Sequence, residues 1–252
     1  MKDRSFVNTI IIGTAIILTA MVLGAAFKNR NASLDSISVT GLGTRDFESD
    51  EIYWSGKFSS KAMVAKDAYN IIIADKEKVK NFFESKGFKT NEFNFGGVSF
   101  EKSYRTITIE SKEGTNKTEQ IFDGYTATQS VSFYSKQNPA LMKKIENVID
   151  QTSELINSGI EFNANPVQYT YSDLPSLKHN LIEKATQDAK ERAQKIVKTA
   201  SGDLGKLKSA TMGVFQITGK GSVEDDSSGG NNDTYSKSKT ARITVRLEYV
   251  LD

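Results

Sequence analysis

The chain has 252 residues, of which 38% are hydrophobic and 25% charged, and it contains no cysteine. This composition is typical of globular proteins and excludes disordered and fibrous chains, while the lack of cysteine excludes disulfides, thiol nucleophiles and thiolate metal sites. The net charge is +2, but residues 1–30 carry +3 and the other 222 residues therefore carry −1. Nucleic-acid binding normally requires a strongly basic face, so we do not expect nucleic acid as a partner.

The first predicted element is an apolar segment near the N-terminus. Residues 6–27 form a run of 22 residues without a charge, and at about 1.5 Å per helical residue they would span roughly 33 Å, close to the thickness of a bilayer core. We predict one transmembrane helix, with residues 1–30 as a membrane anchor or signal-anchor in the inner membrane and residues 31–252 as a domain in the periplasm. The alternative is a secretory signal, cleaved beside small residues such as Ala20 and Gly24, that would release the domain into the periplasm.

Two pairs of strands are predicted in the first half of the chain. Alternating and β-branched residues in 37–43 and 51–61 indicate two strands joined as a hairpin. Stretches 91–110 and 121–136 indicate a second, longer hairpin whose strands are joined by the charged polar loop 111–119.

Three helices are predicted from apolar residues at three- and four-residue spacing. The first covers 65–86 and ends at Gly87, where a left-handed cap fits. The second begins at Pro139 and ends at Gly159, and the third covers 177–200. The apolar face of the third helix contains an alanine stripe, which would let the helix lie very close to a sheet: Ala185, Ala189 and Ala193.

Three strand-like stretches and one long polar tract make up the rest of the chain. The strands are predicted over 161–172, 204–218 and 240–251. Residues 219–238 are rich in Gly, Ser, Asn and Asp without periodicity, and we predict a mobile loop there. Hairpins mixed with helices indicate an α+β fold, in which antiparallel sheets have helices packed on one face, rather than a doubly wound dinucleotide fold.

Short motifs occur in one order along the domain: Ile37-x-Val39-x-Gly41-x-Gly43 with Asp50, Gly124-Tyr125-x-Ala127, Ala185-x2-Asp188-Ala189-x2-Arg192-Ala193-x2-Ile196, Gly202-x-Leu204-Gly205, and Val245-x-Leu247-x-Tyr249-x-Leu251. As an ordered set they resemble the SIMPL family, also called DUF541, of bacterial cell-envelope proteins. Ser49 departs from the proline that usually precedes the aspartate, and the polar insertion near Gly229 is a second departure. The resemblance implies a SIMPL-like α+β domain exposed to the envelope, no established enzymatic activity, and homo-oligomeric assembly that is ring-like or channel-like.

Few residues are candidates for chemistry. His179 is the only histidine, and its polar neighbours place it on the exposed side of a helix, so we interpret it as structural or solvent-facing. The acidic cluster Glu224, Asp225 and Asp226 lacks the spacing of a calcium loop and is interpreted as solvated. We therefore predict no catalytic residue, no cofactor-binding or metal-binding residue, and no enzymatic activity.

Three residues are candidates for a contact between subunits. Asp188 and Arg192 stand four apart on the third helix and can pair across one turn, either to orient that helix or to contact another subunit. Trp54 lies in an aromatic strand and could anchor an interface, although the sheet core is the better explanation of its position.

Two functions of different classes follow from these features. The first is a membrane-anchored, non-catalytic envelope protein that assembles with copies of itself through strand edges or the alanine-faced helix. The second is a monomeric binding module that receives an envelope protein or ligand at loop 219–238 and its aromatic strands. A third, a hydrolase built on His179 and a carboxylate, would be excluded by unchanged activity in His179→Ala.

Overall fold

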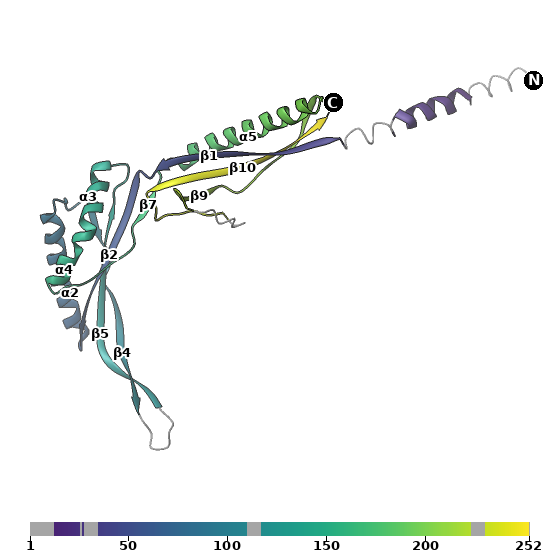
Figure 1. Ribbon diagram of the computed structural model, residues 1–252. Coiled ribbons are helices and arrows are strands. Elements are labelled where there is room, and N and C mark those ends of the chain that lie inside the picture. Colours follow the sequence, from purple (N-terminus) through teal and green to yellow (C-terminus); the bar gives the residue numbers. More distant parts are fainter. Residues whose placement is uncertain (1–12, 26, 28–34, 110–116, 223–229, 252) are drawn as a thin grey trace, which may run out of the picture.

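The computed structural model describes residues 13–25, 27, 35–109, 117–222 and 230–251. Two antiparallel sheets lie at an angle to each other, and each carries its helices on one face (Figure 1). The predicted α+β class is therefore confirmed. Residues 13–25 are helical, and none of the helices within the described ranges is long and apolar enough to cross a bilayer. The remainder of the predicted anchor, residues 1–12, 26 and 28–30, lies outside the described ranges.

The first sheet, called sheet A, is centred on the last strand of the chain. Its members are β1 (Ser36–Glu48), β8 (Leu204–Met212), β9 (Gln216–Gly219) and β10 (Ser238–Leu251). Strand β10 pairs with β1 along its whole length and, on its other side, with β8 and β9. Alternate residues of β10 face helix α5 (Leu174–Thr199), because side chains along a strand point to opposite faces, and these are buried: Ala241, Ile243, Val245, Leu247 and Tyr249.

The second sheet, called sheet B, is centred on β2 and β5. Its strands are β2 (Glu51–Ala62), β3 (Phe93–Phe95), β4 (Ser99–Ile109), β5 (Lys117–Tyr134), β6 (Glu161–Ala164) and β7 (Gln168–Thr170). Its helical layer consists of α2 (Ala65–Ser85), α3 (Pro139–Ile149), the 3-10 turn η1 (Asp150–Thr152) and α4 (Ser153–Asn157). The long β4–β5 hairpin, predicted from the sequence, is confirmed.

The first predicted hairpin is wrong, although both of its strands exist. Strand β1 pairs with β10 in sheet A, whereas β2 pairs with β5, β6 and β7 in sheet B. Only Ser49 and Asp50 separate β1 from β2, and their amides donate to Lys237 and Thr170 instead of closing a turn. The chain thus passes from one sheet into the other at these two residues, because each strand buries its apolar face against a different helical layer.

The helix boundaries agree with the sequence where capping residues define them. Helix α2 is followed by Gly87 at φ 87°, the left-handed conformation that the sequence predicted. Helix α3 begins at Pro139, and the Asn138 side chain accepts hydrogen bonds from two amides of its first turn. The second predicted helix is interrupted by η1, where the Thr152 hydroxyl donates to the Ile149 carbonyl over 2.7 Å.

The strands predicted over 161–172 and 204–218 are each divided in two. Pro166 falls between β6 and β7, and proline has no amide hydrogen to donate to a sheet. In the other stretch, Gly213 lies between β8 and β9 and keeps its backbone bond to Thr244 over 2.8 Å. Both halves of each stretch nevertheless pair with the same central strand.

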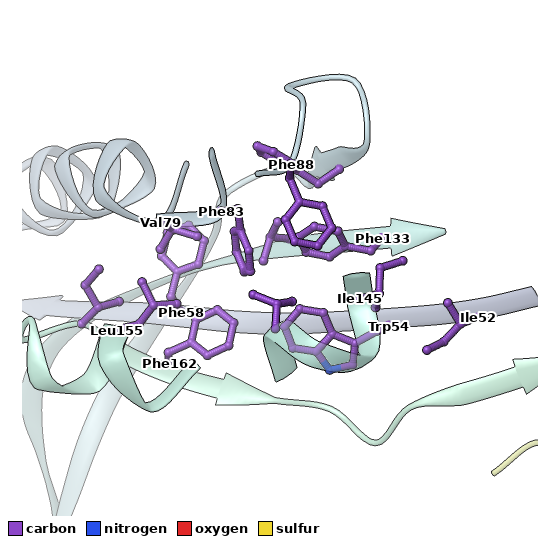
Figure 2. Packing of buried hydrophobic residues seen from close by; sticks show 14 of the residues in the cluster. Ile52, Trp54, Phe58, Val79, Phe83, Phe88, Phe133, Ile145, Leu155 and Phe162 are labelled. Carbon is purple, nitrogen blue, oxygen red and sulfur yellow. The ribbon is translucent and has the colours of Figure 1, made fainter. Parts of the chain in front are cut away.

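An aromatic cluster fills the core between sheet B and its helices (Figure 2). The Trp54 side chain has no exposed surface, and its indole lies 5.3 Å from the Phe133 ring and 6.2 Å from the Phe83 ring, measured between centroids. The indole Nε1 donates a hydrogen bond to the Asn165 carbonyl over 3.1 Å. This burial confirms the sheet-core interpretation of Trp54, so its side chain offers no surface to a second subunit.

Glu146 on α3 joins the two sheets at their junction. Its carboxylate accepts from the Lys237 ammonium over 2.8 Å, just before β10, and from the Tyr169 hydroxyl over 3.2 Å, on β7. Burial, with the carboxylate beside it, raises the pKa of Tyr169 to about 12. Tyr169 also donates its amide to the Thr234 carbonyl over 2.7 Å. Part of the tract predicted as a mobile loop therefore makes specific contacts at this junction, while its residues 223–229 lie outside the described ranges.

The carboxylate of Glu248, on β10, is expected to make the stability of the fold depend on pH. Its carboxylate accepts hydrogen bonds from Ser36 on β1 and from Lys208 and Ser209 on β8, which lowers its pKa from the ordinary 4.5 to about 2. A lowered pKa in the folded state contributes stability above about pH 4.5 that is lost as the pH falls towards 2.

We therefore expect Glu248→Gln to weaken the dependence of stability on pH between 4.5 and 2, which urea unfolding at a series of pH values would measure. The control is Glu77→Gln, on the exposed side of α2, which should retain the wild-type profile. If the free energy of unfolding changed equally with pH in the wild type and in Glu248→Gln, the lowered pKa of Glu248 would be contradicted.

Candidate functional site

The motif residues meet where helix α5 crosses strand β1 of sheet A. Gly41 and Gly43 lie on the face of β1 that α5 covers, and both are buried. A Cβ added to Gly41 would lie 2.1 Å from the carbonyl oxygen of Ala185 and 2.4 Å from the amide nitrogen of Ala189. A Cβ on Gly43 would lie 2.2 Å from the carbonyl oxygen of Leu181. The backbones of helix and strand are therefore in direct contact, which only glycine allows on the strand side.

The alanine stripe makes the same contact from the helix side. Ala185, Ala189 and Ala193 have no exposed surface and pack among the apolar residues of sheet A. This confirms the prediction that the stripe lets α5 lie very close to a sheet. The alanine face is therefore already buried within the chain, whereas other residues of α5 remain exposed.

Asp188 fixes α5 to the outer edge of β1. Its Oδ2 accepts a hydrogen bond from the Leu42 amide over 2.9 Å, and Leu42 stands between the two glycines. The same carboxylate pairs with Arg192, whose Nε lies 2.9 Å from Oδ2. The Arg192 hydrogen bond, followed by the Leu42 amide, lowers the pKa of Asp188 below its usual 3.8. Among the described strands, none pairs with this edge of β1. The Asp188 carboxylate therefore gives the Leu42 amide the hydrogen-bond acceptor that a neighbouring strand would otherwise supply.

Removing the Asp188 carboxylate should destabilise this contact. We expect Asp188→Ala to lower the free energy of unfolding by about 1–2 kcal/mol, because the Leu42 amide loses a charged acceptor and Arg192 loses its partner. Urea denaturation at pH 7 measures the change. Arg192→Ala, which leaves the Leu42 bond in place, should have a smaller effect. If the two variants were equally destabilised, the hydrogen bond between Leu42 and Asp188 would contribute nothing to the free energy of unfolding.

The other predicted candidates lie apart from this contact. His179 is exposed on α5, as the sequence indicated. Glu224, Asp225 and Asp226 lie outside the described residues. Within the part of the chain that the structure describes, no three His, Asp or Glu side chains are grouped so that they could hold a metal ion.

Two features of the contact were missed in the sequence. Gly41 and Gly43 were noticed only as parts of a motif, although two glycines at i and i+2 lie on one face of a strand and indicate close approach by another backbone. The role of the Leu42 amide carried no signal at all, because backbone groups look alike in any sequence.

A polar cleft of about 850 Å³ lies at one end of sheet B. Strand ends and the start of α3 line it with side chains that can donate or accept hydrogen bonds, among them Glu51, Glu92, Asn94, Tyr134 and Asn138. The Tyr134 hydroxyl donates to Glu51 over 2.8 Å, and this bond raises the pKa of Tyr134. The cleft thus offers several hydrogen-bonding groups to a ligand.

The contact between α5 and β1 lies within the range of a known family. The family described as SIMPL, "Protein of unknown function (DUF541)", matches residues 37–249, from β1 to β10. No curated protein matches the chain. The matched residues include the Gly41 and Gly43 pair, the alanine stripe, Asp188 and Arg192. The chain belongs to the SIMPL family.

Proposed function

We propose that the protein is a non-catalytic envelope protein whose SIMPL domain assembles with copies of itself while the apolar N-terminal segment holds it in the inner membrane. The observation that carries this proposal is the structural role of the motif that runs from Ala185 to Ile196. Its alanines are buried against β1, and its Asp188 is bonded to Leu42 and Arg192. Residues used in this way stabilise a scaffold and are not presented to a substrate.

The strand edges of sheet A support self-association. Among the described strands, β1 and β8 each pair on one side only. Asp188 covers part of the β1 edge, whereas β8 is exposed along most of its length and presents Leu207 and Met212 to solvent. Unpaired strand edges with apolar side chains favour pairing with another chain. An assembly of this kind, ring-like or channel-like, is what we propose for the domain.

The membrane anchor is supported by the described part of the N-terminal segment. Large apolar side chains of helical residues 13–25, such as Leu18 and Val22, are more than half exposed, a state that an apolar solvent would stabilise. We expect the full-length protein to stay in the membrane fraction after an alkaline wash, and a version beginning at Asn31 to be released. Recovery of a shortened N-terminus in the soluble periplasmic fraction would instead favour the cleaved signal.

The decisive experiment is the mass of the detergent-solubilised full-length protein, measured by light scattering over a range of concentrations. A stable multiple of 27.8 kDa is expected after subtraction of the detergent. A monomer at every concentration would contradict self-assembly. It would favour the second candidate, a monomeric binding module, for which the polar cleft beside Glu51 and Tyr134 is the specific supporting observation.

A further inference from the structure

The polar cleft at the end of sheet B has walls that are fixed by hydrogen bonds. Its lining comes from the start of β2, the stretch around β3, the end of β5 and the start of α3. The turn between β5 and α3 is closed by a bond from the Asn138 amide to the Ser135 carbonyl over 3.2 Å. The buried Ser135 hydroxyl accepts from the Ile52 amide over 2.9 Å and donates to the Lys136 carbonyl over 2.8 Å. The cleft is therefore preformed.

The backbone of Lys136, in this turn, has an uncommon conformation. Its φ is 48°, in the left-handed region that residues with a side chain rarely adopt. Such conformations persist where the surrounding structure fixes them, and they cluster at functional sites. The conformation of Lys136 thus points to a role for the turn beyond the connection of β5 to α3.

Three amide side chains of the lining are free to bind a ligand: Asn91, Asn94 and Gln137. All three residues are exposed, and none of these side chains makes a hydrogen bond to another described residue. An amide side chain presents a donor and an acceptor next to each other. Since a hydroxyl group also both donates and accepts, two neighbouring hydroxyls of a sugar can bond to one such amide.

The charges of the cleft are balanced. The Glu51 carboxylate accepts from the Tyr134 hydroxyl over 2.8 Å, and Glu92 pairs with Lys144 at 3.0 Å. The remaining charged residue of the lining is Lys136, so that two basic residues balance two acidic ones. A site for a highly charged ligand would carry an excess of the opposite charge. The cleft therefore favours a neutral ligand.

Two tyrosine rings continue the cleft onto the face of sheet B opposite its helices. Tyr53 and Tyr134 stand directly opposite each other on β2 and β5 and are 41% and 45% exposed. Their neighbours Trp54 and Phe133 are buried in the core, so the tyrosines point to the other face. The C–H groups on one face of a sugar ring are apolar and can pack on an aromatic ring, while the hydroxyls at its rim remain available for hydrogen bonds.

An extended peptide is the main alternative ligand, and the lining disfavours it. Peptide-binding grooves provide apolar pockets for alternate side chains of the peptide. Among the described residues that line the cleft, Leu141 is the only aliphatic one, and it is only 9% exposed. The cleft therefore lacks the aliphatic pockets that would select a peptide.

The size of the cleft suits a ligand of several sugar units. Its volume of about 850 Å³ lies within the range of roughly 300–1,000 Å³ that is usual for small-molecule sites. A second cavity of about 550 Å³ lies between α3 and the crossing from β1 to β2. Gln137 lines both cavities, so a chain of linked units can extend from one into the other.

We propose that the cleft binds a short, neutral oligosaccharide. The amides of Asn91, Asn94 and Gln137 bond to its hydroxyls, and the rings of Tyr53 and Tyr134 pack against a sugar face. This binding goes beyond the proposed self-assembly and does not depend on it, because a monomer and an oligomer both contain the cleft.

Binding is tested on the full-length protein in a detergent whose head group contains no sugar. The probes are three neutral trisaccharides of different linkage, namely maltotriose, cellotriose and triacetylchitotriose, with trialanine as the peptide. Saturation-transfer NMR detects binding, and calorimetry gives the dissociation constant. We expect at least one trisaccharide to bind with a Kd of about 1 mM or tighter, and trialanine not to bind at the same concentrations.

Variants of the lining then locate the bound sugar. Asn94→Ala and Tyr134→Ala are each expected to weaken binding by about fivefold to tenfold, whereas Tyr134→Phe, which keeps the ring, should lose less. The matched control is Asn157→Ala, an exposed amide at the end of α4 and outside the lining, which should bind as the wild type does. Circular dichroism checks that each variant is folded.

The outcomes separate this inference from the proposed function. No binding of any trisaccharide at about 10 mM, ten times the expected Kd, overturns it. Binding of trialanine alone overturns it in favour of a peptide site. Sugar binding that is unchanged in both Asn94→Ala and Tyr134→Ala places the sugar elsewhere and also overturns it. The mass of the detergent-solubilised protein tests self-assembly independently of all these results.

Discussion

Replacing Gly41 by alanine is expected to lower the free energy of unfolding by about 3 kcal/mol or more, although alanine is normally the better residue in a strand. The added Cβ would lie 2.1 Å from the Ala185 carbonyl oxygen and 2.4 Å from the Ala189 amide nitrogen. These are backbone atoms inside α5, so no side-chain rotation relieves the overlap. The helix must move away from β1, and the Asp188 bond to Leu42 is strained as it does so.

The matched control for Gly41→Ala is Gly97→Ala, an exposed position where no atom lies within 4 Å of the added Cβ. That variant should be as stable as the wild type or slightly more stable, since alanine restricts the unfolded chain. Urea denaturation of both variants measures the difference. If Gly41→Ala were as stable as Gly97→Ala, the close contact between α5 and β1 would not exist in solution.

The Asp188 and Arg192 pair illustrates how far the sequence could predict the site. Their spacing of four predicted an ion pair across one helical turn, and the structure has it at 2.9 Å. The alanine stripe likewise predicted a close helix–sheet contact. The sequence could not identify the strand beneath the helix, because Leu42 of β1 lies 146 residues before Asp188 and pattern alone does not pair distant elements.

The hairpin error has a related physical origin. Neighbouring strands usually pair, so the short connection at Ser49 and Asp50 suggested a turn. The choice of partner instead depends on which helical layer buries each strand, and that is a property of the whole chain. Strand β1 has glycines that suit α5, whereas β2 has Trp54 and Phe58 that suit the aromatic core of sheet B. Local pattern predicted both strands correctly and could not predict that they belong to different sheets.

The outer part of the β4–β5 hairpin shows a third limit. Alternation and the polar loop predicted the β4–β5 hairpin, and the structure confirms their pairing. Nothing in the local pattern indicated that β2 ends opposite Tyr125 and leaves the outer hairpin without a third strand. The exposure of Tyr104 and Phe122 follows from that difference in strand length, and a strand's length relative to its neighbours is known only from the assembled sheet.

The second large effect is expected in the core of sheet B. Trp54→Ala should lower the free energy of unfolding by about 3–5 kcal/mol, because it removes a fully buried indole and leaves a cavity. The ring contacts with Phe83, Phe133 and Phe162 disappear together, and the Asn165 carbonyl loses its donor. Thermal or urea unfolding followed by far-UV circular dichroism measures the loss, since the variant lacks the chain's only tryptophan.

The control for Trp54→Ala is the adjacent residue on the same strand. Tyr53 points to the opposite face of β2 and is 41% exposed, so Tyr53→Ala should destabilise the protein by less than about 1 kcal/mol. A comparable loss in both variants would mean that the strand itself, rather than the aromatic core, determines stability. If Trp54→Ala also left the mass of the assembled protein unchanged under conditions where it remains folded, Trp54 would act only within the chain, as its burial implies.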